Sequence, residues 1–331
     1  MSARMKLWLC NLALLAPATW LFWNRFTVFS QPGTLARTMA GMRAILDGSA
    51  PTPYRYRPLV AFVFVHGQQA LWSLGLPPLR AHEAIASFLL AFGSAGLVTG
   101  LRAWLDCWIE DGALAALGTS IALVLFLGLS PNLQANPWHL VEDSLTCWGL
   151  VAIRRGRVGI AIALLVLAAL TRETAVFFAL GAAVLTCRRG WWPVAMLAVW
   201  GVCYGLLRLC VGPGADYNTL AQRMMENRAH AGHWLGLWAL FLAPVLAMGV
   251  YRLAQTHRRG EWHQARTALA LAAVGGCYLC ALLLFTFWAE IRIALWIWLA
   301  PVALSGWSRR ALLAEREQRA TSARPRPISL A

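Results

Sequence analysis

The chain has 331 residues, of which 59% are hydrophobic and 13% are charged, and its formal net charge is +15. A soluble domain carries about 25% charged residues, so this composition excludes an ordinary soluble domain and favours a membrane protein with several spans. The positive charge would also suit nucleic acid, but the arginines occur in short clusters between apolar segments and no nucleic-acid-binding module is visible. We therefore predict membrane lipid, and no nucleic acid, as a partner.

Apolar runs bounded by charges, proline or glycine predict an all-α bundle of about ten transmembrane helices. They cover 7–23, 82–101, 112–130, 139–153, 158–171, 173–187, 191–211, 234–255, 267–288 and 291–307. The first begins like a signal peptide but has no small-residue cleavage site before the next polar stretch, so we expect it to be retained as a helix. A further run, 58–76, contains His66, Gln68 and Gln69, and its polarity predicts a re-entrant or interfacial element.

The arginine clusters between the apolar runs orient the bundle by the positive-inside rule. Clusters at 154–157, 188–189 and 258–259 and in the C-terminal tail lie on the cytoplasmic side, so both termini are expected there. The outer loops are then 24–81, which is long, and 131–142, 212–233 and 289–292. A single transmembrane domain, 1–307, is followed by a basic and partly disordered tail, 308–331.

The segment 158–187 is expected to form a hairpin of two short helices whose tip, Arg172 and Glu173, points outward. The alternative is one long tilted helix with a buried ion pair. The hairpin is favoured because it keeps the arginine clusters at both ends of the segment on the same side of the membrane.

The eight cysteines lie mostly within apolar runs, where we expect small packing residues. No zinc-ligand spacing, P-loop or G-x-G-x-x-G motif is present. The motifs therefore predict no metal centre.

Charged residues near a lipid core are costly, and they are usually paired or functional. Five clusters fall on the predicted outer side, and this convergence predicts a site there. In Pro53–Pro58, alternating Tyr54, Arg55, Tyr56 and Arg57 offer planar donors for phosphate or carboxylate. Anchoring of these side chains at the membrane interface is the alternative.

The other clusters carry carboxylates beside further arginines. His139, Glu142 and Asp143 begin a helix, where acidic residues are favoured by the helix dipole; Asp143 is also a candidate general base or metal ligand. Arg172 and Glu173 are candidates for substrate contact or for structural pairing, for instance of Arg172 with Asp143 or Glu290. Glu290 and Arg292 share a short outer turn, and the polar residues around Asp216 and Glu226 are expected to be solvated.

Several of these stretches together resemble the GT-C superfamily of membrane glycosyltransferases, in particular an uncharacterised bacterial branch. They are the Tyr-Arg-x-Arg-Pro-like stretch in a long first outer loop, Asp143 entering a helix after an outer loop, Arg-Arg-Gly-Arg at 154–157, Leu-Thr-Arg-Glu-Thr-Ala at 170–175 and the Glu-x-Arg turn at 290–292. The resemblance implies a polyprenyl-phosphate-linked sugar as donor, an active site on the outer face of a bacterial inner membrane and, in some members, a divalent cation. In that superfamily an acidic catalytic residue often stands early in the first outer loop; here Asp47 occupies that region, without a second acid beside it.

Two classes of function follow. In a glycosyltransferase of the cell envelope, Asp143 or Asp47 would act as base, while Tyr54, Arg55, Arg57, His139, Glu142, Arg172, Glu173, Glu290 and Arg292 would line the substrate site. In a transporter, lipid-carrier flippase or non-catalytic assembly subunit, the same groups would serve as an anion path or as structural pairs.

Overall fold

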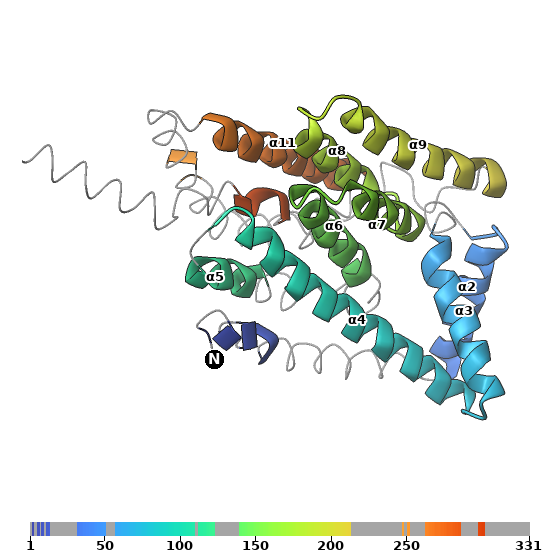
Figure 1. The fold of residues 1–331 in the computed structure, drawn as a ribbon. Helices are drawn as coiled ribbons and strands as arrows, with labels where there is room; N and C mark the ends of the chain where they lie inside the picture. The colour runs from blue at the N-terminus through green and yellow to red at the C-terminus, as the bar shows by residue number, and fades with distance from the viewer. Residues whose placement is uncertain are drawn as a thin grey trace, which may run out of the picture.

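The structure, a computed structural model, describes residues 32–50, 57–109, 112–122, 139–212, 262–285 and 297–301, with a few further positions within 2–13 and 247–251. This part of the chain consists of α-helices and their connecting turns, without a strand, as predicted. The helices are α2 (Pro32–Leu46), α3 (Pro58–Ser73), α4 (Pro78–Asp106), α5 (Gly112–Ala122), α6 (His139–Arg154), α7 (Val158–Thr171), α8 (Ala175–Thr186), α9 (Trp192–Val211) and α11 (Trp262–Phe285). Figure 1 shows α4 running beneath α6 to α9, with α2 and α3 gathered at one end.

Several predicted helices agree with the observed ones to within two residues. The runs 139–153, 158–171 and 173–187 correspond to α6, α7 and α8. The helix expected at 82–101 is longer, because α4 starts at Pro78, where proline suits the first turn, and continues through Asp106. The first outer loop contains the unpredicted helix α2. Most of the runs 7–23, 234–255 and 291–307 lies outside the described residues.

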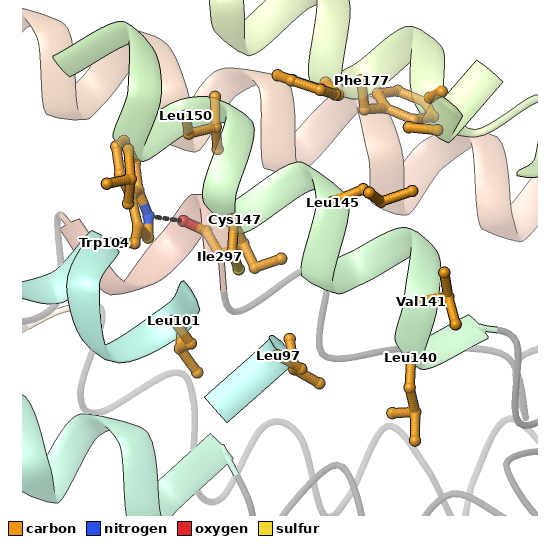
Figure 2. Packing of buried hydrophobic residues seen from close by; sticks show 14 of the residues in the cluster. Leu97, Leu101, Trp104, Leu140, Val141, Leu145, Cys147, Leu150, Phe177 and Ile297 are labelled. Carbon is orange, nitrogen blue, oxygen red and sulfur yellow. Dashed lines mark hydrogen bonds between the residues drawn. The ribbon is translucent and has the colours of Figure 1, made fainter. Parts of the chain in front are cut away.

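Glycines allow α4 and α6 to pack closely. A Cβ atom built on Gly93 would lie 2.9 Å from Leu140 Cβ, and one on Gly100 would lie 2.9 Å from Cys147 Cβ. The later glycine of α4 contacts the later residue of α6, so the two helices are parallel. Figure 2 shows buried apolar side chains of both helices, among them Leu97 and Leu101 of α4 and Leu140 and Cys147 of α6, and the Trp104 indole donating to the Ile297 carbonyl at 2.9 Å. Small residues at such a contact are typical of helix packing in membranes.

Filling this contact should destabilise the protein. In Gly100→Leu, the new side chain would meet Cys147 and Trp148, and overpacking of this kind costs about 1–3 kcal/mol. Thermal unfolding in detergent, followed by tryptophan fluorescence, should show a lower midpoint than wild type. Gly201→Leu is the matched control, because Gly201 lies inside α9 with nothing within 4 Å of its built Cβ. Equal shifts in both variants would contradict the packing argument.

The segment 158–187 forms two helices. Arg172 has an extended backbone, with φ −161° and ψ 152°, and ends α7. Thr174, before α8, contacts Glu142 near the start of α6, and Phe178 lies against Gly149 further along α6. Helix α8 is therefore parallel to α6 and antiparallel to α7. This confirms the predicted hairpin of two helices, and the alternative of one long tilted helix is wrong.

Charged side chains mark the two ends of this bundle. We call the end where α6 and α8 begin the Glu142 end, and the end where both finish the Arg154 end. Arg154 Nη2 donates to the Cys107 carbonyl at 3.2 Å, which places the end of α4 at the Arg154 end. A Cβ atom built on Gly48 would lie 3.1 Å from Val211, so the turn after α2 lies beside the end of α9.

Two described helices, α4 and α9, are long and apolar enough to cross a membrane by length and composition. Within α9 the buried residue is Met196, whereas Val194, Val202, Leu206 and Leu209 are exposed. A large exposed apolar surface marks contact with a membrane or with another protein. These two helices indicate an association with the membrane.

Candidate functional site

The first element of the candidate site is a bidentate ion pair that joins the start of α3 to the turn between α7 and α8. Arg57 precedes Pro58, the first residue of α3. Its Nε donates to Glu173 Oε2 at 3.2 Å and its Nη2 donates to Glu173 Oε1 at 2.8 Å. The Arg57 side chain is 9% exposed and that of Glu173 is 23% exposed. Parallel N–H···O bonds of this kind are strong and directional, so this pair joins segments 116 residues apart in the chain.

Arg172 is the centre of the cluster. Its side chain is 1% exposed, because the extended backbone after α7 turns it inward between α6 and the α7–α8 turn. Arg172 Nε lies 3.6 Å from Glu142 Oε2, and Nη2 lies 3.9 Å from Glu173 Oε1. Thr174 Oγ1 donates to Glu142 Oε1. One guanidinium thus stands between two carboxylates, each of which has a further partner.

Asp143 completes the cluster, and its surroundings differ from those of Glu142. It is buried, with 3% of its surface exposed, and the charges acting on it are those of Glu142 and Arg172. Among the described residues, no hydrogen bond to its carboxylate is found. Glu142 has Thr174 and Arg172 as partners, so the two neighbouring carboxylates differ in their hydrogen bonding.

The charges of this site are nearly balanced. Arg57 and Arg172 contribute two positive charges, against three negative charges when Glu142, Asp143 and Glu173 are all ionised. Within the described residues, no group of three or more His, Cys, Asp or Glu side chains is placed to hold a metal ion. Both arginines face carboxylates, so a phosphate that binds either arginine must compete with a glutamate.

Asp47, the other candidate base, lies in the turn after α2. Its Oδ1 accepts the Ser49 backbone N–H at 3.0 Å and the Ser49 hydroxyl at 2.6 Å. The Ser49 hydroxyl, and then its backbone N–H, hold the pKa of Asp47 below its ordinary value. A lower pKa makes a carboxylate a weaker base, so this geometry favours Asp143 over Asp47.

The remaining predicted site residues fall outside what the structure describes. Tyr54, Arg55, Glu290 and Arg292 are among them, as are Asp216 and the segment 226–228. His139 is the first residue of α6, but its side chain is not described. The structure therefore brings together Arg57, Glu142, Asp143, Arg172 and Glu173 from the predicted set.

Sequence reasoning missed Thr174 as a member of the cluster. No signal in the sequence points to it, because its role depends on the turn after α7 lying against Glu142 of α6. Gln68 was read as a sign of an interfacial segment, but it is fully buried and hydrogen-bonded to His82 of α4, with Nε2 and Nδ1 2.8 Å apart. Gln68 therefore serves helix packing, whereas His66 and Gln69 are exposed, with Nδ1 of one and Oε1 of the other 3.1 Å apart.

Comparisons with protein-family models, with curated protein sequences and with solved structures find no match to this chain. The function is therefore inferred from the cluster at the Glu142 end. That cluster consists of a buried carboxylate beside paired arginines, at one end of an apolar helical bundle.

Proposed function

We propose that the protein is a glycosyltransferase-like enzyme of the GT-C type in a bacterial inner membrane, with about ten spans and both termini in the cytoplasm. Its donor is a sugar linked to a polyprenyl phosphate, and its site is the Glu142 end on the outer face. The exposed apolar surface of α9 supports the membrane setting, as do the shorter apolar helices α7 and α8. The observation that carries the proposal is Asp143, a buried carboxylate beside Arg172 and without a hydrogen bond among the described residues.

The proposed reaction needs a base and a group that stabilises the departing phosphate. The acceptor hydroxyl attacks the anomeric carbon of the sugar, its proton passes to Asp143, and the bond between sugar and phosphate breaks with its electrons on the phosphate. Arg57 and Arg172 stabilise the charge of the polyprenyl phosphate that leaves. General base catalysis contributes about 10²–10⁴-fold in rate, and the phosphate already activates the bond that breaks.

In this proposal, Glu173 holds Arg57 until the donor arrives. The two oxygens of Glu173 accept bonds in the arrangement that a phosphate would adopt on the same guanidinium. A donor phosphate would then take the place of Glu173 on Arg57. Arg57 can therefore pair with Glu173 in the absence of donor and still bind the donor phosphate.

Removing the competing carboxylate should strengthen phosphate binding. In Glu173→Gln, Arg57 loses a charged partner worth about 1.5–3 kcal/mol, so a short-chain polyprenyl monophosphate should bind about tenfold more tightly. Isothermal titration of the protein in detergent measures this change. Glu83→Gln is the matched control, because Glu83 pairs with the exposed Arg80 at 2.9 Å. Unchanged or weaker binding in Glu173→Gln would show that Glu173 does not compete with phosphate.

The reaction itself is tested with purified protein in lipid and a panel of polyprenyl-phosphate sugars, with transfer or release of the sugar followed by mass spectrometry. We expect turnover with at least one donor, and its loss in Arg57→Ala and Asp143→Asn. A folded protein that binds donors but turns none over would instead be a transporter, a flippase or a non-catalytic assembly subunit. The balanced charges of the cluster are the observation that favours this second class, because paired charges also serve as structural or transport elements.

A further inference from the structure

The Arg154 end of the bundle carries two turns of the same design. At the end of α6, Arg154 and Arg155 precede Gly156, and at the end of α8, Arg188 and Arg189 precede Gly190. Both glycines have positive φ, 77° and 63°, the conformation that ends a helix and that side chains other than glycine rarely adopt. Because α6 and α8 run in the same direction and pack together, both turns lie at the same end. Helix geometry thus presents two arginine pairs side by side.

Arginines near a helix end can simply complement the carbonyls there. Arg154 does so, since it donates to the Cys107 carbonyl and its guanidinium lies 4.7 Å from the centre of the Trp108 ring. Arg155, Arg157, Arg188 and Arg189 are exposed, and their side chains make no hydrogen bond or ion pair within the described residues. These four guanidinium groups therefore remain available to an external anion.

The described surroundings fit the headgroup region of a membrane. Trp191 is 65% exposed and stacks on Trp192 with ring centres 4.3 Å apart, immediately after the second arginine pair. Tryptophan is enriched at the interface between lipid and water. Helix α9 then begins at Trp192 with its exposed apolar surface. The described acidic side chain near this end is Asp106, which lies 3.3 Å from Arg102 Nε.

We propose that the two Arg-Arg-Gly turns form a binding site for the phosphate groups of anionic phospholipids. The guanidinium groups of Arg155, Arg157, Arg188 and Arg189 supply planar donors for the phosphate. Trp191 and Trp192 lie at the level of the headgroups, and α9 contacts the acyl chains. This site lies at the opposite end of the bundle from Asp143 and does not depend on the proposed transfer reaction.

The test is native mass spectrometry of the full chain in detergent, titrated separately with phosphatidylglycerol and phosphatidylcholine. We expect retention of phosphatidylglycerol in preference to phosphatidylcholine. Two double variants, Arg155→Gln/Arg157→Gln and Arg188→Gln/Arg189→Gln, should each weaken phosphatidylglycerol binding, by about fivefold for each arginine removed. Because these side chains are exposed and unbonded among the described residues, their loss should leave the unfolding midpoint unchanged.

The matched control is Arg80→Gln/Arg208→Gln, which removes the same charge from exposed arginines of α4 and α9 away from the two turns. It should bind phosphatidylglycerol like the wild type. Equal retention of the two lipids by the wild type would overturn the proposal. So would wild-type retention in both double variants, or an equal loss in the control.

Discussion

Asp143→Asn should abolish sugar transfer while leaving the protein folded. The amide has the shape of the carboxylate but cannot take a proton from an acceptor hydroxyl, so the rate of transfer should fall about 10²–10⁴-fold. Stability should be preserved or slightly increased, because Asp143 lies beside the negative charge of Glu142. Single-turnover transfer from the active donor, together with the unfolding midpoint, measures both effects.

The neighbouring carboxylate provides a sharp contrast. Glu142 accepts a hydrogen bond from Thr174 and pairs with Arg172, so Glu142→Gln should lower the unfolding midpoint, unlike Asp143→Asn. Asp47→Asn should retain most of the transfer rate, because Ser49 already occupies that carboxylate. If Asp143→Asn turns over like the wild type, Asp143 is not the base. Loss of turnover in Asp47→Asn would indicate Asp47 as the base, and wild-type turnover in both variants would indicate a residue outside the described part of the chain.

Local signals in the sequence predicted much of the helical layout. The ends of α6, α7 and α8 coincide with charged residues or with arginine pairs followed by glycine, and such signals act within a few residues. The hairpin followed from the positive-inside rule, because it keeps the arginine clusters at 154–157 and 188–189 on one side of the membrane. Its expected tip, at Arg172, is where the backbone becomes extended. Boundaries of this kind need no knowledge of the tertiary structure.

The ion-pair partners of the charged residues depend on how distant segments of the chain approach each other. Local sequence patterns do not indicate that approach. For a structural role of Arg172, pairing with Asp143 or Glu290 was the example expected; the described residues place Arg172 between Glu142 and Glu173, and Glu290 lies outside them. Arg57 was expected to bind a ligand or to anchor at the membrane interface, and its pairing with Glu173 was not predicted. Both differences arise because the α7–α8 turn folds onto the start of α6.

The burial of Gln68 in α3 was missed for a related reason. The polar residues of 58–76 indicated a surface, but Gln68 meets His82 from the next helix. A buried polar side chain cannot be told from an exposed one until its partner is known. The glycine contacts between α4 and α6 were missed as well, because glycines spaced along an apolar run give no sign of which helix they will face.

Arg172→Leu should cause the largest loss of stability in the described part of the chain. The side chain is fully buried, and its removal leaves Glu142 and Glu173 close to each other without the positive charge between them. Breaking a buried ion pair in this way costs about 3–5 kcal/mol. Chemical unfolding in detergent measures the loss. Arg80→Leu, which breaks the exposed pair with Glu83, should cost less than about 1 kcal/mol.

A double-mutant cycle tests whether Arg172 stabilises the fold or only binds the phosphate of the donor. Arg172→Leu leaves Glu142 without its cationic partner, whereas Glu173 keeps Arg57. Adding Glu142→Gln removes that unpaired carboxylate, so the double variant should lose less stability than the sum of the single variants. Additive losses would show that Glu142 and Arg172 are not coupled. If Arg172→Leu unfolds like the wild type but no longer binds polyprenyl monophosphate, Arg172 serves the ligand alone. Coupled stability together with weakened binding is the outcome we expect, because Arg172 stands between Glu142 of α6 and the turn that carries Glu173, the partner of Arg57.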